Sequence, residues 1–183
     1  MNHAHLIPKA LSAAECQSLI ALCAAGPLHD AGLVRATTAH TIRRADLSWL
    51  DDLPQASWVM DRMTRVVAEA NRESFNFELT DFAESPQVAR YTAERIGHFD
   101  WHSDIGAGPL AARRKLTIVV QLSDPQDYQG GSLELRPDST IRQSPTAQGT
   151  AILFPSFTLH RVTPVSQGTR WSLTLWSHGP AFR

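Results

Sequence analysis

The sequence predicts an α+β, mainly β protein: an antiparallel sandwich or barrel with N-terminal helices packed on one face. Two observations support this fold class. Turn signals recur at short intervals through the second half of the chain, between short apolar and β-branched runs. Helical periodicity is confined to the first half. With 183 residues, we expect one domain over residues 1–183, with a helical part at about 1–75 and a strand-rich core at about 85–180.

Two segments of the first half have helical signals. Ser12 and Glu15 form a capping-box pattern, and the helix that follows should end before Gly26-Pro27. Cys16 and Cys23 are expected to be buried on this helix as small apolar side chains. A second helix is predicted from about Pro54 to Arg72 by the apolar stripe of Val59, Met63, Val66, Val67 and Ala70.

The remaining segments are predicted as loops and strands. Residues 28–50 are mixed and polar, and we expect a loop there with one possible short strand. Four later runs are predicted as strands, at residues 116–122, 131–135, 149–154 and 169–176. The turns between them are Ser123-Asp124-Pro125, Gly130-Gly131 and Ser166-Gln167-Gly168.

Composition excludes several classes of protein. A chain with 43% hydrophobic and 19% charged residues is neither disordered nor collagen-like. No apolar run approaches the ~20 residues of a membrane span, so no membrane partner is expected. Seventeen basic and eighteen acidic residues give a net charge of −1, which offers no general attraction to nucleic acid. The first residues lack the features of a secretory signal, which favours a cytoplasmic location.

Two His-x-Asp pairs are the candidate metal ligands: His98 with Asp100, and His102 with Asp104. In an extended chain, alternate side chains share a face, so either pair can grip one metal ion. A third ligand would complete the triad of two histidines and one carboxylate found on non-haem iron(II). His160 is the best third ligand.

Arg170 supports this choice of third ligand. If residues 164–168 form a hairpin turn, residue 160 lies across from residue 172, and His160 shares a face with Arg170, Ser172 and Thr174. The other face carries Trp171, Leu173 and Leu175. An arginine beside a metal site suits an anionic co-substrate, because guanidinium binds carboxylate in a bidentate manner. The alternative is a solvated outer face.

From about Val88 to Trp176, the residues resemble the iron(II)- and 2-oxoglutarate-dependent oxygenases, in the branch of prolyl 4-hydroxylases and PKHD-type hydroxylases. Phe99 precedes His102 by three positions, as the aromatic residue does in the family, and Arg170 follows His160 by ten. The other motifs that carry the resemblance are Tyr91, Gly97, His102-x-Asp104, Leu122-Ser123-Asp124-Pro125, Tyr128-x-Gly130-Gly131-x-Leu133, Gly149-x-Ala151-x-Leu153-Phe154-Pro155, His160-x-Val162 and Gly168-x-Arg170-x-Ser172.

The resemblance implies a double-stranded β-helix, or cupin-like jelly roll, with the N-terminal helices packed on one sheet. It implies that His102, Asp104 and His160 bind Fe(II), and that Arg170 binds 2-oxoglutarate with help from Ser172 and Tyr91. Tyr91 lies slightly further upstream than the family pattern places its tyrosine. His98 and Asp100 then become candidates for the pocket rim or for contacts behind the ligands.

The implied activity is that of a dioxygenase that converts 2-oxoglutarate and O2 to succinate and CO2 while it hydroxylates a second substrate, with ascorbate as a reductant. Phe99, Trp101, Phe154 and Phe157 are candidates for the apolar surround of the metal.

The substrate is expected to be a small molecule or an amino-acid side chain, and the sequence does not indicate the oligomeric state. The pocket walls are expected from residues 28–50 and 105–114, where Arg113, Arg114 and Lys115 either meet an acidic substrate or form a solvated basic cluster.

Two further activities of the same superfamily fit the residues less well. A nucleic-acid dealkylating oxygenase would carry a second arginine where this chain has Trp176, and a halogenase would lack Asp104. A cupin-like sensor that binds a metal and a ligand without turnover is the other alternative.

Overall fold

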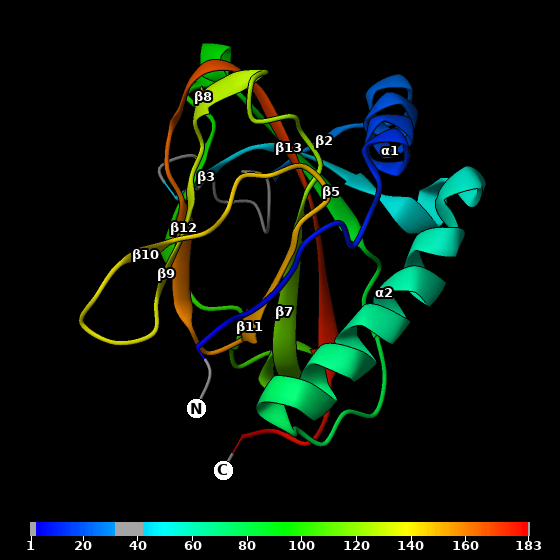
Figure 1. Ribbon diagram of the computed structural model, residues 1–183, viewed down its shortest axis with the longest axis vertical. Coiled ribbons are helices and arrows are strands. Elements are labelled where there is room, and N and C mark those ends of the chain that lie inside the picture. Colours follow the sequence, from blue (N-terminus) through cyan, green and yellow to red (C-terminus); the bar gives the residue numbers. More distant parts are fainter. Residues whose placement is uncertain (1–2, 32–41, 183) are drawn as a thin grey trace.

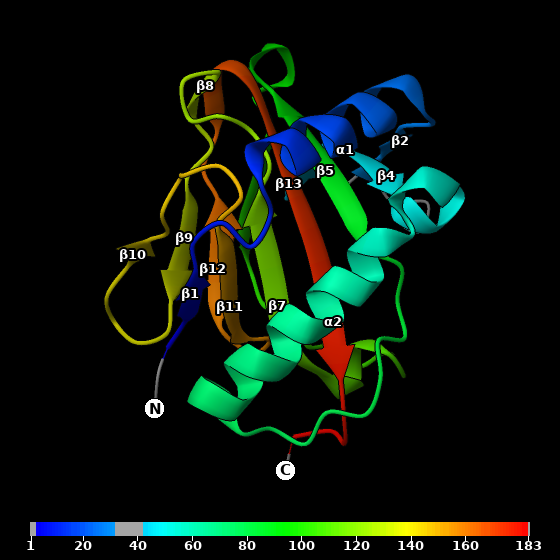
Figure 2. The ribbon, with the colours of Figure 1, turned by 45° about the vertical axis from the view of Figure 1, so that its right-hand side comes forward.

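The computed structural model describes residues 3–31 and 42–182. Two antiparallel sheets face each other, and α1 (Ala13–Ala25) and α2 (Trp58–Ala70) cover the outer face of the larger one (Figures 1 and 2). This arrangement is a jelly roll with helices on one sheet, which confirms the predicted fold class. No helix within the described residues is long and apolar enough to cross a membrane.

The larger sheet has the spatial order β1 (His5–Ile7), β11 (Ala151–Pro155), β7 (Arg114–Gln121), β13 (Val165–His178), β5 (Gln87–Thr92), β4 (Asp46–Trp49) and β2 (His29–Asp30), and β8 (Tyr128–Gly130) also pairs with β13. The smaller sheet has the order β10 (Arg142–Gln143), β9 (Leu133–Arg136), β12 (Leu159–Val162), β6 (His98–His102) and β3 (Arg43–Arg44). Every strand pair is antiparallel within the described residues.

Both predicted helices are present. Ser12 Oγ accepts from the Glu15 backbone N–H at 3.2 Å, and the Glu15 carboxylate accepts from the Ser12 N–H at 2.8 Å, so the capping box of α1 is confirmed. The second helix begins later than predicted, because Pro54–Ala56 forms a 3-10 turn and α2 starts at Trp58. It ends earlier, in a π-helical turn at Asn71–Phe75.

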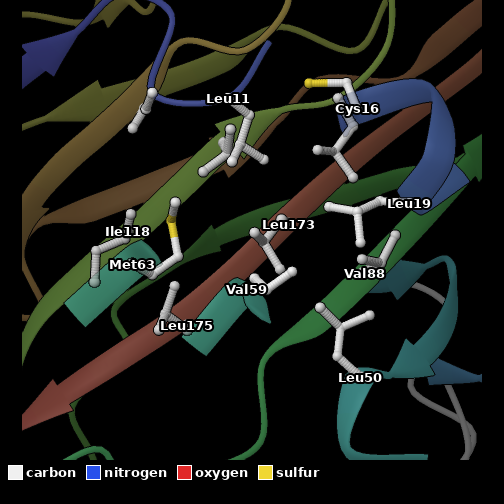
Figure 3. Packing of buried hydrophobic residues seen from close by; sticks show 14 of the residues in the cluster. Leu11, Cys16, Leu19, Leu50, Val59, Met63, Val88, Ile118, Leu173 and Leu175 are labelled. Carbon is white, nitrogen blue, oxygen red and sulfur yellow. The ribbon is translucent and has the colours of Figure 1, made fainter. Parts of the chain in front are cut away.

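Two apolar cores lie on the two faces of the larger sheet. One packs α1 and α2 against the outward side chains of β7 and β13, and Figure 3 shows Leu19, Val59, Met63, Ile118 and Leu173 in this core. Cys16 and Cys23 are fully buried in it, as predicted. The second core fills part of the space between the two sheets. The helices therefore leave the inner face of the larger sheet to face the smaller sheet.

The polar segment at residues 28–50 contributes more strands than expected. Short strands β2 and β4 extend the edge of the larger sheet beside β5, and β3 forms the edge of the smaller sheet beside β6. Residues 32–41 lie outside the described part of the chain. The observed pairing places Arg43 opposite Phe99, whose ring stacks on the predicted metal ligand His102.

The hairpin proposed around Ser166 is wrong. His160 on β12 pairs with His102 and Leu135 in the smaller sheet, whereas Ser172 on β13 pairs with Ala89 and Gln121 in the larger sheet. Residues 166–168 belong to β13 itself and run beside β8.

Gly168 allows β8 and β13 to pair closely and does not form a turn between strands. It has φ +69°, and an added Cβ would lie 2.0 Å from the Asp127 carbonyl oxygen, so only glycine allows β8 and β13 to approach so closely. The chain therefore changes sheets between Val162 and Val165, and His160 faces Arg170 across the sandwich.

Candidate active site

A hollow lies between the two sheets and is lined by polar and apolar side chains from both. The larger sheet contributes Gln87, Tyr91, Val119, Arg170, Ser172, Thr174 and Trp176, and the smaller sheet and its flanks contribute Arg43, Phe99, His102, Asp104, Leu133, His160 and Val162. The alternation along β13 explains the polar lining. Its even-numbered residues from 170 to 176 face the hollow, and Trp171, Leu173 and Leu175 face the helices.

His102, Asp104 and His160 meet at one end of this hollow. Their nearest ligand atoms all lie within 4.8 Å of one another. Asp104 Oδ1 is 3.7 Å from His102 Nε2, and Asp104 Oδ2 is 3.5 Å from His160 Nε2. These positions follow from the strand pairing, because His102 and His160 are direct partners in the β6–β12 ladder. The three side chains therefore form a group able to hold a metal ion.

Backbone hydrogen bonds fix both imidazoles in the orientation that a metal requires. His102 Nδ1 donates to the Asp100 carbonyl oxygen at 2.7 Å, and His160 Nδ1 donates to the Thr158 carbonyl oxygen at 2.9 Å. A neutral imidazole that donates through Nδ1 carries its free lone pair on Nε2. Both Nε2 atoms point at Asp104, so the tautomers suit coordination.

The surroundings keep His102 neutral and Asp104 charged. Burial, together with the nearby His160, lowers the pKa of His102 to about 4. Burial alone would raise the pKa of Asp104, but His160, His102 and the Thr117 hydroxyl more than offset it and hold this pKa below its usual value. A neutral imidazole and an ionised carboxylate are the protonation states in which these groups bind metals.

Aromatic rings pack against both candidate histidine ligands. Phe99 stacks on His102 with ring centroids 3.5 Å apart and an interplanar angle of 14°. Phe154 lies beside His160, with centroids 4.8 Å apart. Trp101 and Phe157, the other predicted members of the apolar surround, do not line the hollow; Trp101 packs on Arg161, and Phe157 is exposed and contacts Phe182.

Arg170 lines the same hollow from the larger sheet. Its side chain is fully buried. Nη2 donates to Gln121 Oε1 at 2.8 Å and Nη1 donates to Ser172 Oγ at 3.3 Å, while Nε is buried without a hydrogen-bond partner in the described chain. Burying a cation beside neutral groups alone is costly. The site is therefore suited to an anion that would neutralise Arg170.

The structure also brings Tyr91 and Ser172 to this position. Tyr91 pairs with Arg170 across the β5–β13 ladder, and the centroid of its ring lies 5.5 Å from the guanidinium carbon. Both Tyr91 and Ser172 are buried in the wall of the hollow. All six candidate site residues of the sequence thus line one cavity, although the pairing that produces this differs from the expected hairpin.

The competing pair His98 and Asp100 does not line the hollow. His98 Nδ1 donates to the Ile96 carbonyl oxygen at 2.8 Å. Asp100 is exposed, and its contribution to the site is the backbone carbonyl oxygen that orients His102.

The basic segment at residues 113–115 is built into the fold rather than directed at the hollow. Arg113 pairs with Asp81 at 2.7 Å, and Lys115 is buried with its amino group 3.8 Å from the Phe182 ring centroid. Arg114 forms an ion pair with Glu84 and donates to the Asp104 carbonyl oxygen at 3.0 Å. Among the described residues, all three side chains thus have partners within the protein, and none of them lines the hollow.

Three functional candidates escaped the sequence reasoning: Thr117, Gln121 and Arg43. Thr117 Oγ1 donates to Asp104 Oδ2 at 2.6 Å, and Gln121 holds Arg170. The sequence does carry a signal for Thr117 and Gln121, because they are the polar residues on one face of the otherwise apolar run Leu116–Leu122. Arg43 had no such signal, since its place depends on the pairing of a two-residue edge strand.

Comparisons with known proteins agree with this geometry. The family model described as the 2OG-Fe(II) oxygenase superfamily matches residues 86–178, which is just over half of the chain. The chain therefore belongs to the 2OG-Fe(II) oxygenase superfamily. The curated relatives that it matches are PKHD-type hydroxylases, and solved prolyl hydroxylases share its fold, which is in line with the branch that the resemblance implied.

The curated relatives match part of their length. A PKHD-type hydroxylase of Pseudomonas fluorescens is 33% identical over 97 residues, which cover 50% of this chain and 42% of that protein. One of Hyphomonas neptunium is 37% identical over 98 residues, covering 51% and 42%. The aligned region thus spans less than half the length of these relatives.

Solved structures share the fold over nearly the whole chain. A prolyl-4-hydroxylase from Pseudomonas putida has a TM-score of 0.78 at 24% identity and covers 97% of this chain and 93% of that one. A prolyl hydroxylase from Trichoplax adhaerens, in complex with a peptide fragment of the hypoxia inducible factor oxygen degradation domain, also has a TM-score of 0.78 at 21% identity, covering 97% and 84%.

Proposed function

We propose that this protein is an Fe(II)- and 2-oxoglutarate-dependent dioxygenase that hydroxylates a small molecule or an amino-acid side chain. His102, Asp104 and His160 would hold the iron, and Arg170, with Ser172 and Tyr91, would hold 2-oxoglutarate. The whole of residues 1–183 would act as one oxygenase domain. We place it in the cytoplasm, with ascorbate as the reductant that keeps the iron ferrous.

The donor set of the site fits this metal. Two imidazole nitrogens and one carboxylate oxygen form the set that leaves open positions on non-haem iron(II). When bound, iron and 2-oxoglutarate supply the oxidising chemistry: O2 and 2-oxoglutarate give succinate and CO2, and the second oxygen atom hydroxylates the substrate. The protein contributes binding, orientation and exclusion of water.

The observation that carries the proposal is the buried guanidinium of Arg170 in the same cavity as the three ligands. A metal site alone would not require a fully buried cation with an unpartnered Nε. A dicarboxylate would satisfy both features, because one carboxylate reaches the metal and the other neutralises Arg170. Ser172 and Gln121 fix the plane of the guanidinium for this contact.

The other residues of the site prepare the two ends for their ligands. His102 and His160 present their Nε2 atoms to the metal position, and Thr117 holds one oxygen of the Asp104 carboxylate. Leu133 and Val119, which also line the hollow, would exclude water from the bound dicarboxylate.

Anaerobic titration tests the proposal. Adding 2-oxoglutarate to the Fe(II)-loaded protein should produce a weak visible charge-transfer band. Arg170→Leu should lower the affinity for 2-oxoglutarate at least about tenfold, and Arg170→Lys should lower it less, because lysine keeps the charge but loses the fork of donors. Absence of the band in the unmodified protein, or unchanged affinity in Arg170→Leu, would overturn the assignment.

Succinate release separates an enzyme from a binding protein without turnover. A screen of candidate substrates in air should find compounds that increase succinate formation above the rate without substrate. A His160→Ala variant should abolish both the band and the release, because it removes one of three metal ligands.

A further inference from the structure

A second guanidinium lines the cavity, on the side of the smaller sheet. Arg43 lies on the edge strand β3, opposite Phe99 in the ladder with β6. Its guanidinium carbon is 4.5 Å from the centroid of the Phe99 ring, and the same ring stacks on His102. Arg43 thus lies close to the metal end of the cavity, where the proposed function places the substrate to be oxidised.

The hydrogen-bonding capacity of Arg43 is largely unused. Nη2 donates to Gln87 Oε1 at 3.4 Å, a long bond to a neutral amide. Nε is buried and has no hydrogen-bond partner within residues 3–31 and 42–182. No carboxylate in those residues lies within ion-pair distance of the Arg43 guanidinium.

Seven arginines outside the cavity behave differently, whereas the exposed Arg65, Arg72 and Arg136 also have no carboxylate partner within 4.0 Å among the described residues. Those with a carboxylate partner within 4.0 Å are Arg62, Arg90, Arg95, Arg113, Arg114, Arg142 and Arg161. Arg161 is a close comparison, because it follows the ligand His160 on the smaller sheet and also packs on an aromatic ring, yet it pairs with Glu134 at 2.7 Å. The two arginines that line the cavity, Arg43 and Arg170, both lack a carboxylate.

With iron and 2-oxoglutarate bound, the cavity would contain no negative charge that is left to balance Arg43. The charged protein groups that line it are Arg43, Asp104 and Arg170. Under the proposed function, the ferrous ion and Arg170 carry three positive charges, and Asp104 and the 2-oxoglutarate dianion carry three negative ones. These cancel, so Arg43 remains as one net positive charge beside the site of oxidation.

We propose that Arg43 is a specificity-determining residue that binds a carboxylate of the substrate, so that the enzyme acts on a small organic acid. The inference rests on the proposed function and adds the chemical class of the substrate. The contact of the guanidinium with the Phe99 ring leaves the N–H donors of Arg43 free to meet the ligand. A carboxylate held there replaces the long bond to Gln87 with charge-assisted ones.

Binding of a matched acid and amide tests this assignment. Anaerobic protein is first saturated with Fe(II) and 2-oxoglutarate, which occupies Arg170, and is then titrated with propionate or with propionamide. Perturbation of the charge-transfer band reports binding beside the metal. Wild type, Arg43→Leu, Arg43→Lys and the control Arg161→Leu are compared.

Propionate should bind the wild type at least about tenfold more tightly than propionamide does. This preference should disappear in Arg43→Leu, fall in Arg43→Lys and persist in Arg161→Leu. The inference is overturned if the wild type shows no preference, which includes the case of no response to either probe, or if Arg43→Leu retains the preference. Failure of the proposed function is distinct, because the band itself would then be missing before either probe is added.

Discussion

The hydrogen bond from Thr117 to Asp104 gives the sharpest test of how the fold prepares the metal site. Thr117 is fully buried on β7, and its hydroxyl donates to Asp104 Oδ2 at 2.6 Å and lies 3.1 Å from Ser156 Oγ. Thr117→Val keeps the shape of the side chain and removes the donor. Because partners behind a metal ligand are typically worth about 10–100-fold in metal affinity, we expect a loss of that size for Fe(II).

Stability should change together with affinity. In the metal-free Thr117→Val variant, the buried Asp104 carboxylate has one hydrogen-bond donor fewer. The free energy of unfolding should therefore fall by about 1.5–3 kcal/mol. The pKa of Asp104 should rise, since the Thr117 hydrogen bond is one of the interactions that lower it. Anaerobic Fe(II) titration measures the affinity, and urea unfolding without metal measures the stability.

Thr92→Val is the matched control. The hydroxyl of Thr92 is buried without a hydrogen-bond partner in the described chain, so replacing it should leave Fe(II) affinity unchanged and stability equal or higher. The reasoning fails if Thr117→Val binds Fe(II) as tightly as the wild type, or if both variants weaken binding equally.

Three further outcomes are expected. Arg170→Leu without 2-oxoglutarate should unfold at an equal or higher temperature, because it removes a buried unpaired charge; clear destabilisation in a calorimetric scan would show that Arg170 is structural. Gly131→Ala should weaken 2-oxoglutarate binding in titrations, because φ is +61° there and the new Cβ would lie 3.0 Å from Arg170 Cδ; unchanged affinity would refute this contact. Burial alone would raise the pKa of Glu84, but Arg114 and His178 lower it below 4.5, so its contribution to stability is present above pH 4.5 and lost as the pH falls through the lowered pKa. Urea unfolding at several pH values should therefore show Glu84→Gln less stable than wild type at pH 7, with the difference shrinking in acid; a constant difference would contradict it.

Much of the site follows from local patterns. Spacing by two residues places His102 and Asp104 near one point, and alternation along β13 directs Arg170, Ser172 and Thr174 into the cavity. The same alternation in Leu116–Leu122 carries Thr117 and Gln121, whose polarity in a buried run was a readable signal. Such patterns depend on the geometry of a single strand, which the sequence expresses directly.

The rest of the site depends on which strands pair and which sheets pack against each other. The chain by itself determined a mainly β fold, two helices and the capping box of Ser12, and its two His-x-Asp pairs, His160 and Arg170 were the candidates among which the family resemblance selected His102, Asp104, His160 and Arg170. Tertiary structure decided that His160 and Arg170 face each other from different sheets, that Arg114 braces the Asp104 backbone, and that Arg43 reaches the cavity. These contacts join segments far apart in the chain, and their partners are selected by the packing of two whole sheets rather than by any local periodicity.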